Sequence, residues 1–173
     1  MGEAIFLTLF GLVVGALMLA AAMKDYRNYK TKLDQLLKRK SYTKYDFSRN
    51  QKMMYFALTV VCLAVAVFCY AQKDYVTGAV GIATGGVFAG QYILSNKRGV
   101  LYYNDDSFIY QDDPIQYKQI ASIETNKYIP FAFRTLITYS GKKYKISKGC
   151  EKIINEQLEK RAAKKAAFKK KMR

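Results

Sequence analysis

The strongest constraint on the fold is a set of three apolar blocks without charge. They cover residues 4–23, 53–71 and 76–94, and none of them contains Asp, Glu, Lys or Arg. Because a helix rises about 1.5 Å per residue, about 20 residues cross the hydrocarbon core of a bilayer, which is roughly 30 Å thick. A helix buried in a soluble core is usually shorter and amphipathic. We therefore expect three transmembrane helices.

The distribution of Lys and Arg predicts how these helices are oriented. Segment 24–52 carries ten Lys or Arg against three acidic residues, and residues 97–173 carry eighteen against eight. Cytoplasmic flanks of membrane spans are enriched in basic residues. With three spans, both basic segments lie on the same side. The sequence thus predicts a multi-pass protein of the cell membrane with its N-terminus outside and its C-terminus in the cytoplasm.

The first apolar block also resembles the hydrophobic part of a secretory signal peptide. A signal peptide begins with basic residues, whereas this chain begins MGEA and carries Glu3. The block is followed by the basic sequence KDYRNYK, which favours retention of that flank in the cytoplasm. We expect an uncleaved first helix.

The third apolar block, VTGAVGIATGGVFAGQYIL, is rich in glycine. The spacing of Gly81 and Gly86 matches the first part of a phosphate-binding P-loop, but Val87 and Phe88 stand where that loop needs Lys and a hydroxyl residue. Small residues four positions apart instead let membrane helices approach closely. We expect such packing, within the chain or alternatively against a protein partner, at Gly11, Gly15, Gly81, Gly85, Gly86 and Gly90.

The basic loop 24–52 begins with a pattern typical of an amphipathic helix. In KDYRNYKTKLDQLLKRK, apolar side chains recur at helical spacing and Lys and Arg occupy the other face. Such a helix either lies on the inner leaflet or continues the first span. The alternative is a solvated connector whose charges only set the topology.

From Val100 onward the sequence changes to short alternating segments. VLYYNDDSFIYQ and TLITYSGKKYKIS are typical of β-hairpins, and YKQIASIET alternates like a strand. The residues after Gly149, to about Lys171, are rich in Ala, Lys and Glu and contain neither Pro nor Gly, which predicts a helix. The expected fold is a membrane domain of three transmembrane α-helices (residues 1–96) followed by a small α+β cytoplasmic domain (residues 97–173). That domain has five or six antiparallel strands and a C-terminal helix.

This order of elements resembles a known family. The short hairpins, the strand YKQIASIE from Tyr117 to Glu124, the Ser-Gly-Lys hairpin and the closing helix are similar to bacterial pleckstrin-homology-like (PH-like) domains, over roughly residues 97–162. Members of that family have seven strands, whereas six at most are recognisable here. The resemblance implies a binding or scaffolding module without catalytic residues.

Two segments of the cytoplasmic domain are candidate contact surfaces. In YIPFAFR, Pro130 excludes a central strand. Its apolar neighbours either insert into the inner leaflet or a partner groove, or belong to the domain core; they are Ile129, Phe131 and Phe133. The tail from Lys160 has eight Lys or Arg and no acid, which suits anionic lipid. The candidate surface residues of the tail are Lys164, Lys165, Lys169, Lys170 and Lys171.

The tail has two alternative interpretations, binding to RNA or a ribosome and simple solubilisation. Catalytic patterns are absent from the sequence: it has no histidine, and its one acidic cluster, at residues 105–106 and 112–113, has the composition of ordinary turns. No charged residue lies within the apolar blocks, which disfavours an ion or proton pathway. We expect no metal, no cofactor and no enzymatic activity.

The sequence therefore favours a non-enzymatic integral membrane scaffold or regulatory protein. Its cytoplasmic domain would bind a protein partner, the anionic inner leaflet, or both. The alternative function is an accessory subunit of a membrane transporter or secretion complex, docked through the glycine-rich helices.

Overall fold

The computed structural model describes residues 2–125 and 134–171, with side chains through Phe168. The chain divides into two compact units. The first consists of Met1–Arg39 and Asp46–Val100, and the second of Lys40–Tyr45 and Leu101–Arg173. The second unit therefore takes a segment from the loop that precedes the second apolar helix.

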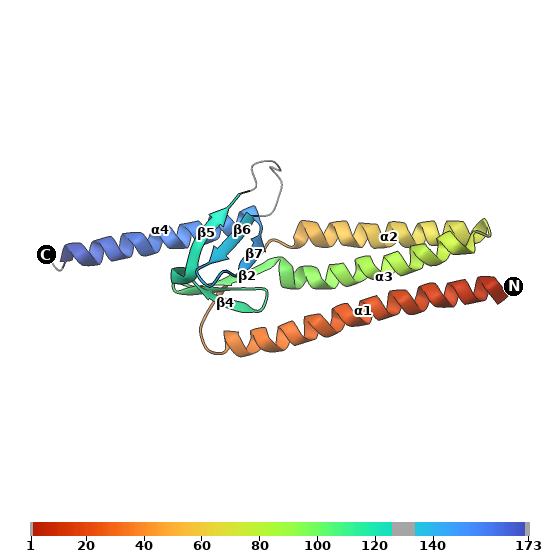
Figure 1. The fold of residues 1–173 in the computed structure, drawn as a ribbon, viewed down its shortest axis with the longest axis horizontal. Coiled ribbons are helices and arrows are strands. Elements are labelled where there is room, and N and C mark those ends of the chain that lie inside the picture. Colours follow the sequence, from red (N-terminus) through yellow and green to blue (C-terminus); the bar gives the residue numbers. More distant parts are fainter. Residues whose placement is uncertain (1, 126–133, 172–173) are drawn as a thin grey trace. The chain divides into compact units, whose positions relative to one another are not determined.

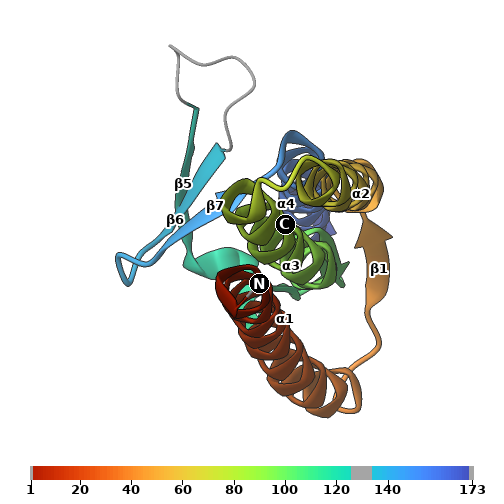
Figure 2. The same cartoon turned by 90° about the vertical axis from the view of Figure 1, so that its right-hand side faces the viewer.

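The first unit contains three helices, α1 (Gly2–Leu37), α2 (Arg49–Ala71) and α3 (Tyr75–Arg98). Each is long and apolar enough to cross a membrane, which confirms the expectation of three such helices. α3 lies between α1 and α2 and packs against both (Figures 1 and 2). The amphipathic segment after residue 23 continues α1 and forms no separate helix.

The turn between α2 and α3 makes these two helices an antiparallel hairpin. The Asp74 amide donates to the carbonyl of Cys69 at 2.9 Å, and Lys73 takes a left-handed conformation with φ of 62°. The Asp74 side chain then accepts a hydrogen bond from the Thr77 amide at 3.1 Å. This contact satisfies one of the free N–H groups at the start of α3.

Glycines on two faces of α3 allow it to approach both neighbours. A Cβ atom at Gly86 would lie 2.5 Å from the Gly15 Cα of α1. A Cβ atom at Gly81 would lie 3.0 Å from the Ala66 Cβ of α2. Small residues at such crossings let the backbones make close van der Waals contact, which drives helix association where the surroundings are themselves apolar.

The large side chains of the three helices mostly point outward. Phe6, Leu9, Val60, Phe68 and Val80 are all more than one-third exposed. A surface this apolar is rare on soluble monomers and is typical of sites that contact a membrane or another protein.

The second unit is built from seven strands within the described residues. The strands are β1 (Thr43–Asp46), β2 (Val100–Tyr103), β3 (Ser107–Tyr110), β4 (Asp113–Gln116), β5 (Ile120–Glu124), β6 (Arg134–Thr138) and β7 (Lys143–Ile146). They form a four-stranded sheet in the order β1-β2-β3-β4 and a three-stranded sheet in the order β5-β6-β7. A short 3₁₀ turn, η1 (Tyr117–Gln119), connects the sheets, and α4 (Lys148–Lys171) follows β7.

The small antiparallel domain with a C-terminal helix is confirmed, but its strands differ from the expectation in two respects. They form two sheets rather than one meander, and their number exceeds six because β1 joins the first sheet. The expectation placed all strands after residue 97. All four residues of β1 are exposed, so this strand carries no alternation of apolar and polar residues.

The core of the second unit lies between the sheets and the first half of α4. Phe108 pairs with Ile115 across β3 and β4, and both side chains are buried. Leu136 of β6 and Ile154 of α4 are also fully buried. The Tyr110 hydroxyl donates to the Lys145 carbonyl at 2.8 Å, which links β3 of one sheet to β7 of the other.

The glycine contacts lead to a first prediction. Replacing Gly86 with Val places a branched side chain against the backbone of Gly15, which cannot rotate away, and we expect a loss of about 1–3 kcal/mol. The control is Val80→Leu, because Val80 lies on the same helix and is 59% exposed. Thermal unfolding of the full chain in detergent measures both variants. Equal melting temperatures for the Gly86 variant and the wild type would contradict this packing.

Candidate functional site

All six candidate glycines lie against helices of the same chain. Four of them line the crossing of α1 and α3: Gly11, Gly15, Gly86 and Gly90. The other two face α2, where Gly81 lies near Ala66 and Gly85 near Leu63. A partner docked on these glycines would have to displace a helix of this chain.

The basic tail belongs to α4, whose two halves differ in burial. Cys150 and Ile154 in the first half are fully buried, whereas the described side chains from Ala162 to Phe168 are exposed. Lys165 is among the exposed residues. The helix continues through Lys169, Lys170 and Lys171, whose side chains lie outside the described part of the structure.

Lys164 and Arg161 contact the acidic turn between β2 and β3. The Lys164 ammonium lies 2.7 Å from a carboxylate oxygen of Asp105, and Arg161 donates to the Asp105 carbonyl at 2.7 Å. The hydrogen bond from Lys164 lowers the pKa of Asp105. Both side chains are mostly exposed, so this pair adds little stability. Of the candidate tail residues, Lys164 is thus already paired within the domain.

The acidic cluster has the geometry of turns. Asn104 accepts hydrogen bonds from the amides of Asp106 and Ser107, at 2.9 and 2.8 Å, and thereby closes the turn between β2 and β3. In the second turn, Asp113 accepts from the Tyr144 hydroxyl at 2.8 Å. Within residues 2–125 and 134–171, no three His, Cys, Asp or Glu residues lie close enough to hold a metal ion.

Three candidate contact residues, Ile129, Phe131 and Phe133, lie outside the described residues.

No pattern in the sequence indicates the close contact that residues 46–48 make with Gly99 at the open end of the α2–α3 hairpin, here called the junction. The Phe47 amide donates to the Gly99 carbonyl at 2.9 Å. Ser48 is fully buried, and its amide and hydroxyl donate to one Asp46 oxygen at 2.8 and 2.6 Å. A Cβ atom at Gly99 would lie 2.7 Å from the Ser48 Cα, so only glycine fits there without displacing the backbone.

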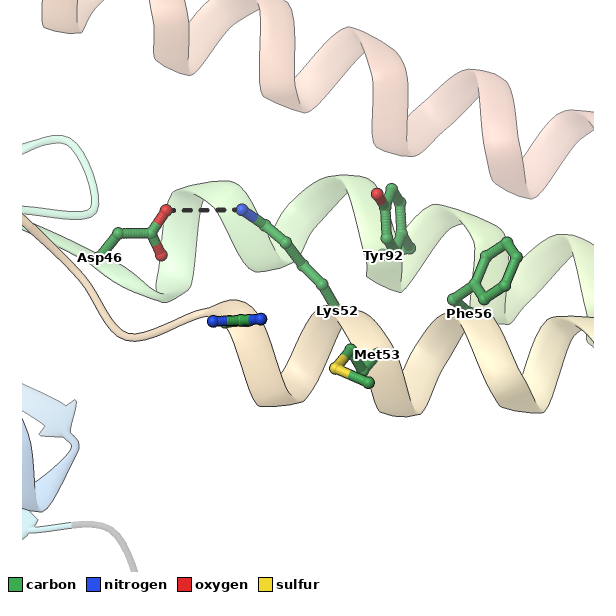
Figure 3. A pocket seen from close by; sticks show the side chains of 6 residues that line it. Asp46, Lys52, Met53, Phe56 and Tyr92 are labelled. Atoms are coloured by element: carbon green, nitrogen blue, oxygen red, sulfur yellow. Dashed lines mark ion pairs between the residues drawn. The ribbon is translucent and has the colours of Figure 1, made fainter.

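An open pocket of about 640 Å³ lies beside this junction (Figure 3). Its lining combines charged and large apolar side chains: Asp46, Arg49, Lys52, Met53, Phe56 and Tyr92. Lys52 and Asp46 form an ion pair at 3.6 Å. The signal in the sequence is the spacing of the α2 residues, at positions i, i+3, i+4 and i+7, which places them on one helix face.

Comparison with known proteins assigns no family to the chain. No family model, no curated protein and no solved structure matches it. What the protein does is therefore inferred from its own residues.

The burial of Cys150 leads to a second prediction. Burial raises the pKa of this thiol to about 11, although a hydrogen bond from Ser147 opposes the shift. The nucleophilic thiolate is therefore scarce at pH 8. In a Cys62→Ala/Cys69→Ala background, we expect N-ethylmaleimide to modify Cys150 only after the protein is denatured.

The control adds Cys150→Ala and Tyr139→Cys to the same background, because Tyr139 is 77% exposed. Mass spectrometry follows the modification of both proteins with time. Equal rates for the two cysteines in the folded protein would show that Cys150 is not in a closed core.

Proposed function

We propose that this chain is a non-enzymatic integral membrane scaffold or regulatory protein. Its three apolar helices span the cell membrane, with the N-terminus outside and the second unit in the cytoplasm. The second unit is a PH-like domain that contacts the anionic inner leaflet and binds a protein partner there.

The place of β1 in the chain carries this proposal. β1 lies between α1 and α2, and it pairs with β2, which follows α3. The first sheet therefore includes segments from both sides of the apolar hairpin. Because the chain passes from this domain into the apolar hairpin and back, the domain is tethered at the membrane boundary.

The strand arrangement supports a PH-like domain. Four strands in one antiparallel sheet, three in a second and a closing helix agree with the seven strands of that family. β1 supplies the strand that the sequence pattern after residue 97 lacks. Because the resemblance implies a binding or scaffolding module, it also supports the proposal that this unit binds a protein partner.

The charge of α4 supports contact with the leaflet. Its outer half is exposed and has basic residues without an acid after Glu159. Each Lys or Arg near an anionic membrane surface contributes about 1 kcal/mol. The accessory-subunit alternative depended on glycines as a docking face, and these glycines are already covered by helices of the same chain.

The third prediction concerns what the full chain retains on purification. After mild lysine cross-linking in native membranes and purification through a C-terminal tag, we expect a stoichiometric protein partner and enrichment of anionic lipid. Replacing the four lysines of the outer tail with Gln should reduce the lipid enrichment; these are Lys165, Lys169, Lys170 and Lys171. Mass spectrometry measures both protein and lipid.

The matched control neutralises four exposed lysines, Lys30 and Lys32 of α1 and Lys38 and Lys40 of the following loop. It removes the same charge elsewhere on the cytoplasmic side. Equal lipid loss in both variants would mean that only total charge matters and would contradict a role for α4. Recovery of the wild-type chain without a partner would contradict the scaffold.

A further inference from the structure

We propose that the pocket at the start of α2 is a binding site for one anionic phospholipid. Arg49 and Lys52 bind the phosphate, and Met53, Phe56 and Tyr92 contact the upper part of an acyl chain. This inference depends on insertion of the helices into a bilayer, but not on what α4 or the PH-like domain binds.

The pocket has charged and apolar parts in the order in which a phospholipid presents them. Along α2, Arg49 and Lys52 come first, then Met53 and Phe56, and Tyr92 of α3 completes the wall (Figure 3). Met53 is 65% exposed and Phe56 is 62% exposed. These exposed apolar side chains lie directly beside two cations. Such a lining suits an amphiphilic ligand better than a small soluble anion.

The charges of the pocket leave a cation for the phosphate. Lys52 lies 3.6 Å from one Asp46 oxygen, while the other Asp46 oxygen accepts two hydrogen bonds from Ser48. Asp46 is thus held by the junction and positions the Lys52 ammonium. Arg49 is exposed and makes no ion pair with the described part of the chain. Two cations against one carboxylate give the lining a net charge of +1.

The depth of these residues agrees with the dimensions of a bilayer. Met53 begins the uncharged block 53–71, so Arg49 and Lys52 lie just outside the expected hydrocarbon core. Phe56 is four residues beyond Lys52, or about 6 Å along the helix. The headgroup layer of one leaflet is roughly 5–8 Å thick. A phosphate at Lys52 therefore places the first acyl carbons near Phe56.

A second basic pair on α1 provides a matched comparison. Lys24 and Arg27 have the same three-residue spacing and lie beside Ala20 and Met23, but their pocket is only about 240 Å³. It contains no aromatic side chain among its lining residues. Nonspecific electrostatic attraction would bring anionic lipid to both basic pairs equally. A shaped pocket would retain the lipid at Arg49 and Lys52 but not at Lys24 and Arg27.

The test uses the full chain in nanodiscs of phosphatidylcholine and phosphatidylglycerol. Native mass spectrometry measures which lipid stays bound to the protein when it is released from the nanodisc. We expect one phosphatidylglycerol to be retained, and its affinity to fall roughly 10- to 30-fold in Arg49→Gln/Lys52→Gln. The control Lys24→Gln/Arg27→Gln should retain the lipid as the wild type does. The four-lysine α4 variant should also retain it, which separates this site from the leaflet contact of α4.

A second measurement needs no variant and therefore does not depend on how a variant folds. A phosphatidylglycerol with a photoreactive acyl chain is cross-linked to the wild-type protein, and the labelled peptides are mapped. We expect the label on the α2 segment that contains Met53 and Phe56, or at Tyr92. Label elsewhere, equal retention of phosphatidylcholine, or equal losses in the two double variants would overturn the proposal.

Discussion

The fold depends on how a helical hairpin is joined to a pair of strands. Packed helices lie about 8–10 Å apart, whereas paired strands lie about 4.8 Å apart. Only Phe47 and Ser48 separate β1 from α2, and only Gly99 separates α3 from β2. The chain segments must therefore converge within one or two residues. A buried serine opposite a glycine permits this, and the hydrogen bond from Phe47 to Gly99 continues the strand pairing into the junction.

The same need for close approach recurs within the three-helix unit. In an apolar surrounding, burying leucine or phenylalanine between helices gains little, so contact depends on small residues that bring backbones together. α3 meets this requirement twice, with Gly86 and Gly90 toward α1 and with Gly81 and Gly85 toward α2. α3 therefore lies between α1 and α2 and packs against both. The position of the lipid pocket follows, because it is lined by the start of α2 and one side chain near the end of α3.

Much of this architecture was predictable from local sequence patterns. Uncharged blocks of about 20 residues identify the three helices, and the Ser-Gly turn identifies the β6–β7 hairpin, where Gly141 has φ of 81°. β1 was not predictable, because all four of its residues are exposed and it is defined only by pairing with a strand more than 50 residues away. The pocket combines adjacent residues of α2 with Tyr92, and only the packing of α2 on α3 brings these together.

β1 belongs to the second unit although a helical hairpin separates it from β2 in the sequence. The most direct test compares residues 97–173 alone with a protein in which Lys40–Asp46 is joined to Val100–Arg173 by a short Gly-Ser turn. A third protein carries a scrambled 40–46 segment as control. Thermal unfolding followed by circular dichroism should be cooperative, with the highest melting temperature, only when the native β1 is present. If all three proteins unfold at the same temperature, β1 does not stabilise the domain and is not part of it.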